Sequence, residues 1–173
     1  MAGVNATGPR SLALEPVTRE AFAPFGELIE AGTGPGREAN LGTALRFDHA
    51  ATLQSTREHA QANLALYRSR PQALPFEVTL FERHPASSQV FAPLRAGRWL
   101  VIVAPDDPAG APDTARARAF VCGPGVAINF RRGVWHHPIV VLDEPAALLM
   151  LAWEDGSGED CEELRLPRPL VVR

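Results

Sequence analysis

The chain has 173 residues, of which 46% are hydrophobic and 21% charged, and its formal net charge is −3. This length suffices for one domain with a substantial core, and the composition is typical of a water-soluble globular protein. The slightly acidic balance argues against nucleic-acid and membrane partners, so we expect a small-molecule ligand. Two cysteines and the lack of an apolar amino-terminal signal segment predict a reduced, cytoplasmic setting without a disulfide.

The amino-terminal part contains a leader and one helix signal. Residues 1–10 mix Gly, Pro, Asn and Thr without periodicity, so we expect a disordered leader followed by a single domain over 11–173. Thr18 is a suitable N-cap for a helix of about two turns that runs through Phe22 and ends before Pro24. This helix is predicted to lie at the periphery of the fold.

Three further segments are predicted to lie between strands. The Gly-rich stretch 32–42 lacks an apolar period and predicts a loop of the length that often covers a site. Residues 52–62 permit a second short, exposed helix. The proline- and aspartate-rich segment 105–114 predicts a surface connection.

Most of the remaining chain consists of short apolar or alternating runs bounded by Pro, Gly or Asp, which is the pattern of β-strands. These runs are residues 44–47, 63–67, 76–84, 89–93, 99–104, 117–122, 126–130, 136–142 and 146–153. Many short strands and little helix predict an all-β sandwich or barrel with one or two short peripheral helices.

The strand predicted at 76–84 carries the first chemical signal. Strand alternation places Val78, Leu80, Glu82 and His84 on one face. A barrel interior explains this set, because the apolar pair would fill the core while the carboxylate and the imidazole open into the barrel mouth. The alternative is that the polar half points to solvent beyond the strand end.

Two blocks of the sequence resemble the two motifs of the cupin superfamily. They are Glu82-x-His84-x4-Gln89 and Gly125-x5-Arg131-x-Gly133-x2-His136. In cupins these motifs read His-x-His-x3–4-Glu and Gly-x5-Pro-x-Gly-x2-His-x3-Asn, and three His and one Glu face a metal. Here the substituted positions are Glu82, Gln89, Arg131 and Val140. The resemblance implies a cupin-like antiparallel β-barrel of the jelly-roll type.

The same positions define a candidate metal site. Glu82, His84, Gln89 and His136 offer a mixed N/O donor set for a divalent ion such as Ni²⁺, Mn²⁺ or Zn²⁺. The competing interpretation is that this polar cluster binds a substrate directly by hydrogen bonds.

A narrower resemblance is to the ureidoglycolate lyase family, which is also called ureidoglycolate hydrolase. It is carried by Glu82-Arg83-His84-Pro85, Gln89-x-Phe91-x-Pro93 and Val134-Trp135-His136-His137-Pro138. It implies a carbon–nitrogen lyase that releases urea and glyoxylate from ureidoglycolate in purine (allantoin) degradation. It also implies a homodimer, nickel as the associated ion and no organic cofactor.

That reaction needs three groups, which are a cation for the carboxylate, a base for the hydroxyl proton and an acid for the departing nitrogen. All seventeen basic residues are arginine, and we expect Arg131 or Arg132 to bind the carboxylate, with Gln89 also in contact with substrate. Glu82 or His84 is the expected base, and His136 completes the catalytic set.

Only one of the two adjacent histidines on the strand that follows Gly133 can point into the barrel. His136 and His137 must point to opposite faces, and the motif register predicts that His136 points inward. His137 is then expected at the exterior or at a subunit interface. Trp135 shares the outward parity.

Other functions remain compatible with these residues. They are an amidohydrolase that releases ammonia from the same substrate, a non-catalytic cupin that binds a small carboxylate, and a metal-dependent dioxygenase or isomerase.

Overall fold

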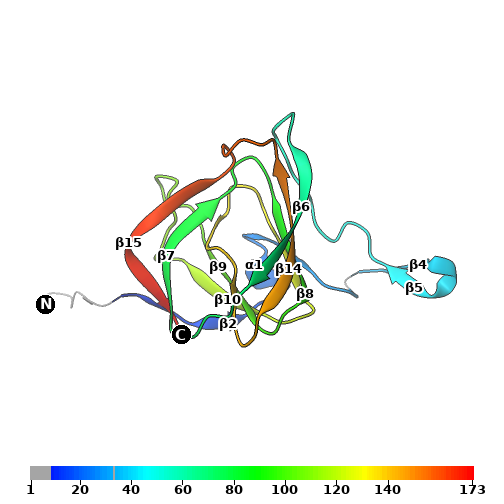
Figure 1. Ribbon diagram of the computed structural model, residues 1–173, viewed down its shortest axis with the longest axis horizontal. Coiled ribbons are helices and arrows are strands. Elements are labelled where there is room, and N and C mark those ends of the chain that lie inside the picture. The colour runs from blue at the N-terminus through cyan, green and yellow to red at the C-terminus, as the bar shows by residue number, and fades with distance from the viewer. Residues whose placement is uncertain (1–8, 33) are drawn as a thin grey trace, which may run out of the picture.

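Two β-sheets face one another across the main core and form a nearly closed barrel in the computed structural model of this chain (Figure 1). The structure describes residues 9–32 and 34–173, so all but the last two residues of the expected leader at 1–10 lie outside it. Most strand pairs are antiparallel, and the expected all-β, cupin-like barrel is confirmed. No helix among the described residues is long and apolar enough to cross a membrane.

The first sheet contains eight strands. Their order is β1 (Ser11–Leu12), β15 (Glu162–Val172), β7 (Phe76–Arg83), β12 (Trp135–His136), β9 (Trp99–Ala104), β10 (Arg118–Cys122) and β2 (Leu14–Pro16), with β13 (Val140–Val141) also paired to β9. The second sheet contains five strands. Their order is β3 (Gly26–Ile29), β11 (Ala127–Phe130), β8 (Gln89–Arg95), β14 (Ala146–Glu154) and β6 (Gln61–Ser69).

Strand β9 separates two apolar clusters. Trp99, Val101 and Val103 point into an inner cluster between the sheets, together with residues such as Phe130 and Leu148. The alternate residues of β9 belong to an outer cluster on the other face of the first sheet. All six residues of β9 are buried, which explains why the sequence there is apolar without alternation.

Each predicted strand overlaps an observed strand, and the differences in their bounds have local causes. The run predicted at 136–142 divides into β12 and β13 around Pro138, which has no N–H to donate to a strand partner. Strand β15 was not predicted, because Pro167 and Pro169 argue against a strand. The structure accommodates both prolines at a shift in the pairing register between β15 and β7.

The same register shift changes the face pattern of β7. Val78 and Phe81 both belong to the outer cluster, although strict alternation places them on opposite faces. The prediction that Val78 shares a face with Glu82 is therefore wrong. Glu82 follows Phe81 and points to the other side of the sheet, toward the barrel interior.

One of the two predicted helices is present. Thr18 caps α1 (Arg19–Phe22) by accepting a hydrogen bond from the Ala21 amide at 3.1 Å, but the helix has one turn rather than two. Residues 52–60 are not helical. They pair instead with the β7–β8 turn, where the Thr56 amide donates to the Ala86 carbonyl and the Ser88 amide donates to the Gln54 carbonyl. These tertiary hydrogen bonds replace the helical ones.

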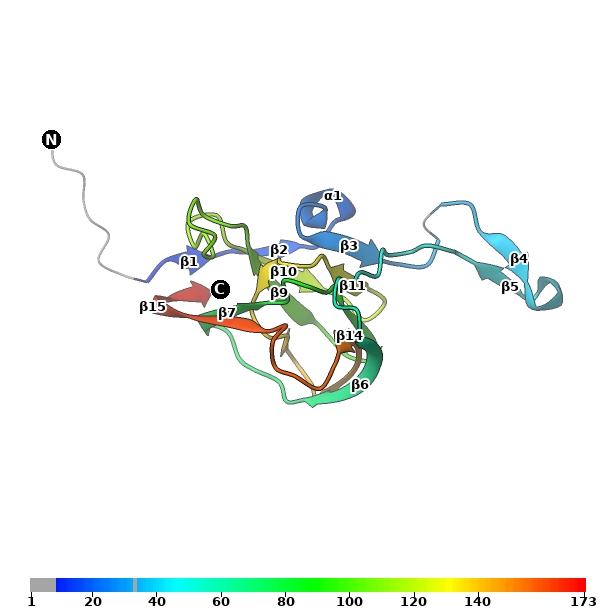
Figure 2. The same ribbon diagram turned by 90° about the horizontal axis from the view of Figure 1, so that it is seen from above.

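The stretch predicted to cover a site forms part of an arm. The arm consists of β4 (Arg37–Ala39), a 3₁₀ turn (Asn40–Gly42) and β5 (Ala44–Arg46), and it projects away from the barrel (Figures 1 and 2). Leu41 at its tip is fully exposed. No residue of this arm lines a cavity described below.

Candidate active site and metal-binding residues

A cavity of about 270 Å³ opens beside the end of β7. We call it the site cavity. Its walls come from β6, the end of β7, the start of β8, the end of β14, the segment before β6 and the β14–β15 loop. The lining residues used below are Arg57, Tyr67, Glu82, His84, Ser87, Gln89 and Asp160. Three of the sequence-predicted site residues, Glu82, His84 and Gln89, thus line one cavity.

A glycine turn brings the two sequence blocks together. Gly133 has a φ of 77°, a conformation that favours glycine, and its amide donates to the His84 carbonyl at 2.8 Å. The chain then enters β12, where His136 pairs with Glu82 of β7. The second block therefore delivers an imidazole directly beside the carboxylate of the first.

His136 is almost fully buried between the inner core and Glu82. Its ring stacks on Phe130 with centroids 4.1 Å apart, and its Nε2 lies 3.5 Å from Glu82 Oε1. That separation is too long for a normal hydrogen bond. His136 faces inward as predicted, whereas His137 lies against Phe76 with ring centroids 5.4 Å apart. His137 is buried rather than exterior.

The backbone orients both imidazoles of the site. His84 Nδ1 lies 2.6 Å from the Asp160 carbonyl oxygen, and His136 Nδ1 lies 2.9 Å from that of Val134. A carbonyl accepts only, so each Nδ1 must carry the proton and donate. In the neutral rings this leaves a lone pair on each Nε2. Both Nε2 atoms are buried and have no hydrogen-bond partner in the structure.

The donor atoms converge closely enough to hold a metal ion. Ligand atoms of Glu82, His84 and His136 all lie within 4.8 Å of one another. Two buried imidazole lone pairs without partners, next to a carboxylate, are the donors that a divalent transition metal prefers. The carbonyls that accept from each Nδ1 provide the outer contacts that metal-binding histidines usually have. The described residues therefore fit a divalent ion.

Electrostatics keep this cluster in the protonation states that such an ion requires. Burial, reinforced by the charge of His136, lowers the pKa of His84 although its bond to Asp160 opposes the change. Burial would raise the pKa of Glu82, but the hydrogen-bonding and charge interactions with the three nearby imidazoles outweigh it, so this pKa is lowered. Near neutral pH, His84 is thus neutral and Glu82 is ionised.

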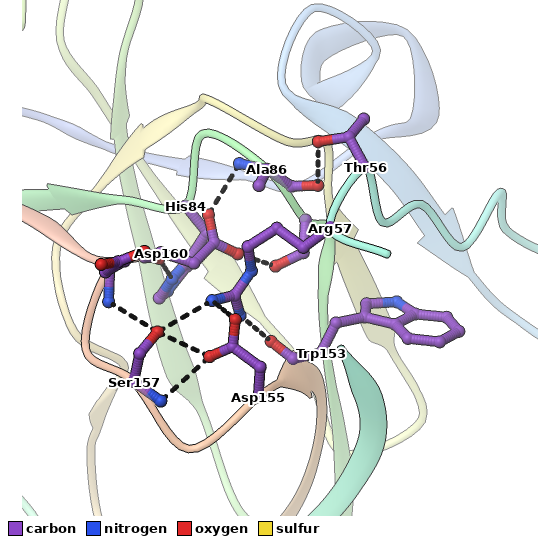
Figure 3. A network of polar contacts seen from close by, with 10 residues as sticks. Thr56, Arg57, His84, Ala86, Trp153, Asp155, Ser157 and Asp160 are labelled. Atoms are coloured by element: carbon purple, nitrogen blue, oxygen red, sulfur yellow. Dashed lines mark hydrogen bonds and ion pairs between the residues drawn. The ribbon is translucent and has the colours of Figure 1, made fainter. Parts of the chain in front are cut away.

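A polar network closes the end of the barrel over His84 (Figure 3). The buried carboxylate of Asp160 accepts from the Ala86 amide at 2.7 Å and from the Ser87 hydroxyl. Asp160 also supplies the carbonyl that holds His84. The β14–β15 loop is in this way tied to the β7–β8 turn, and the imidazole is held between them.

Arg57 is a cavity residue that the sequence did not reveal. Its guanidinium lies 2.6 Å from Asp155 and also donates to the Trp153 carbonyl at 3.0 Å (Figure 3). Its Nε is buried and has no hydrogen-bond partner. Among the described residues it is the one arginine that lines the site cavity. The sequence places it in an apparently exposed polar cluster, which carries no signal of this position.

The structure does not bring the two expected carboxylate-binding arginines to this cavity. Arg131 is exposed and donates to the Ala23 carbonyl at 3.2 Å. Arg132 lines a separate cavity of about 470 Å³ beside Trp135. Trp135 belongs to the outer cluster, which agrees with its predicted outward parity.

Fold and site together define a cupin-like β-barrel with imidazole and carboxylate donors at one end. A model of the ureidoglycolate lyase family matches residues 9–173. The chain therefore belongs to the ureidoglycolate lyase family.

Individual relatives agree with this assignment. The chain is 40% identical to the ureidoglycolate lyase of Burkholderia mallei (strain NCTC 10229), with 93% of this chain and 92% of the relative covered. It is 37% identical to that of Rhizobium etli (strain ATCC 51251), with 95% and 97% covered. A solved structure of a dTDP sugar isomerase from Desulfovibrio desulfuricans G20 aligns with a TM-score of 0.47 and 18% identity, covering 82% of this chain and 87% of the other. The sequence relatives match over nearly their full lengths.

Proposed function

We propose that this protein is a ureidoglycolate lyase that converts ureidoglycolate to glyoxylate and urea during purine degradation in the cytoplasm. One observation carries the proposal. In a member of this family, a cationic side chain, an ionised carboxylate and a neutral imidazole line a single cavity of small-molecule size. These are the groups that cleavage of a hemiaminal carboxylate requires.

We assign the substrate carboxylate to Arg57 rather than to Arg131 or Arg132. Arg57 lines the cavity, and its other contacts to Asp155 and the Trp153 carbonyl hold the guanidinium in place. The guanidinium lines the cavity, and a carboxylate oxygen is a strong acceptor for guanidinium N–H groups. Arg57 therefore binds and orients the substrate, and the Gln89 amide supplies a second polar contact.

Glu82 is the base in this scheme. It is ionised near neutral pH and lines the cavity beside His84, so it can accept the substrate hydroxyl proton. Loss of that proton forms the carbonyl of glyoxylate as the carbon–nitrogen bond breaks. His84 stays neutral, and its Nε2 lies close to the Glu82 carboxylate.

The metal held by this family member is proposed to be Ni²⁺, bound by Glu82, His84 and His136 with Gln89 nearby. When bound, such an ion lowers the pKa of a coordinated hydroxyl and so weakens the demand on the base. A carboxylate has two oxygens, so Glu82 can bind through one and accept a proton on the other.

The proposed activity is tested by incubating the purified protein with ureidoglycolate. We expect glyoxylate and urea in equal amounts, above the spontaneous rate. Ammonia without urea would identify an amidohydrolase instead. Thermal stabilisation by the ligand without any turnover would identify a carboxylate-binding cupin.

The assignment of Arg57 is tested by substitution. Arg57→Ala should raise KM by about 10- to 100-fold, the effect of losing one charge-assisted hydrogen bond. Arg131→Ala and Arg132→Ala are the matched comparisons, and their unfolding temperatures and KM values are measured alongside. A rise in KM for either of these two, without one for Arg57→Ala, would contradict the assignment.

A further inference from the structure

A second cavity of about 200 Å³ lies on the other side of Glu82 and Gln89. We call it the inner cavity. Tyr67, Glu82 and Gln89 line both cavities. The inner cavity is otherwise lined by Ser69 and by apolar residues, and no arginine from the described chain contributes to it. The site thus has two compartments that share one wall, and among the described residues only the site cavity contains a guanidinium.

The guanidinium distinguishes the two ends of the substrate site. Ureidoglycolate has an anionic carboxylate at one end and an uncharged ureido group at the other. The site cavity contains Arg57 beside the carboxylates of Glu82, Glu154 and Asp160, whereas the inner cavity offers hydroxyl and amide groups from Tyr67, Ser69 and Gln89 beside Glu82. Uncharged hydrogen-bonding groups suit the ureido end, and transfer of a carboxylate there would leave its charge unpaired.

Tyr67 is held in the shared wall by its neighbours. It is on β6, opposite Leu148 of β14, and its ring meets the Phe91 ring edge-to-face with centroids 5.7 Å apart. Its hydroxyl has no hydrogen-bond partner among the described residues. Partial burial, with the charges of Glu82 and Glu154, raises the pKa of Tyr67. The hydroxyl is therefore protonated near neutral pH.

We propose that the ureido group occupies the inner cavity and that the Tyr67 hydroxyl donates the proton to the departing nitrogen. The inference rests on the proposed lyase function and adds a residue and a substrate orientation to it. Glu82 takes the hydroxyl proton, the carbonyl forms, and the electrons of the carbon–nitrogen bond pass to nitrogen, which receives the Tyr67 proton. Glu82 then returns its proton to the phenolate, so the protein is unchanged and the products are glyoxylate and urea.

The first test is Tyr67→Phe, which keeps the ring and removes only the hydroxyl. We expect kcat to fall by about 10²- to 10⁴-fold, the usual contribution of a general acid, with KM little changed. Arg68→Gln is the matched control, because Arg68 is exposed and points to the opposite face of the same strand. An unchanged kcat in Tyr67→Phe would overturn the inference.

The second test uses the fact that Tyr67 is the only tyrosine in the chain. Biosynthetic replacement of tyrosine by 2-fluoro- and 3-fluorotyrosine therefore changes the acidity of this one phenol and keeps its hydroxyl. At a pH below the pKa of every phenol in the series, kcat should vary in graded fashion with phenol acidity. A structural role for Tyr67 predicts no such trend, and its absence would overturn the inference.

These outcomes separate the two proposals. Failure of the unmodified protein to form glyoxylate from ureidoglycolate would overturn the lyase function itself. Full lyase activity that is indifferent to both changes at Tyr67 would leave the function standing and overturn the role of Tyr67.

Discussion

The nitrogen that carries the proton on each imidazole decides what this site can bind. The carbonyls of Asp160 and Val134 take the Nδ1 protons of His84 and His136, so both Nε2 lone pairs are directed toward Glu82. Neither Nε2 has a partner in its buried position. Such atoms are costly to leave unpaired, and a metal ion satisfies both at once.

We predict that the substitution His136→Ala weakens the binding of a divalent ion. Native protein should be stabilised by Ni²⁺ and should bind it in calorimetry, because an ion that binds only the folded state raises its unfolding temperature. Removal of one imidazole should lower the affinity by at least about 10-fold. His59→Ala, at an exposed histidine outside the site cavity, is the control. Equal Ni²⁺ affinity in all three proteins would contradict the assigned ligands.

The β14–β15 loop is the element that completes the site. It contributes Asp155, which holds Arg57, and Asp160, which holds both His84 and the β7–β8 turn. The positions of His84 and Arg57 therefore depend on the same loop. Its sequence is acidic and Gly-rich and gives no indication of this role.

We predict that Asp160→Ala is destabilising and slows the reaction. The Ala86 amide and the Ser87 hydroxyl lose their acceptor, which should lower the free energy of unfolding by about 1–3 kcal/mol. The carbonyl that orients His84 should also shift, and loss of such an outer contact typically costs about 10- to 100-fold in activity. Chemical denaturation and steady-state kinetics measure the two effects. Glu159→Ala, at the exposed neighbouring residue, should change neither.

Two of the exposed apolar regions among the described residues are candidates for an interface between subunits. One is the outer face of the second sheet, where Leu64 and Leu66 are 65% and 58% exposed on the edge strand β6. The other is the arm, with Leu41 at its tip. A homodimer, which resemblance to the family implies, needs a self-complementary surface, and a sheet face beside an open edge strand is a flat surface of this kind.

We therefore predict that the double substitution Leu64→Glu and Leu66→Glu converts a dimer to a monomer. Four carboxylates would face one another across a two-fold interface, and their burial without partners is strongly unfavourable. Sedimentation velocity measures the change. Leu41→Glu on the arm is the comparison. Dissociation by this single change, with a dimer retained in the sheet variant, would place the interface on the arm instead.

The sequence by itself determined most of the barrel strands and the pair Glu82 and His84. Period-two patterns and the bounding Pro and Gly residues are local properties, and so is the spacing that places a carboxylate and an imidazole at one strand end. The parity of His136 relative to His137 is equally local. The family followed from short strings of residues around these same positions.

Only the tertiary structure decided which residues surround that pair. Arg57, Tyr67 and Asp160 lie far from Glu82 in sequence or in apparently exposed segments, and strand pairing and loop hydrogen bonds bring them to one end of the barrel. The same long-range contacts replaced the helix predicted at 52–62 and allowed a strand through Pro167 and Pro169. Local patterns specify a residue's conformation and face, whereas its neighbours depend on how the sheets close.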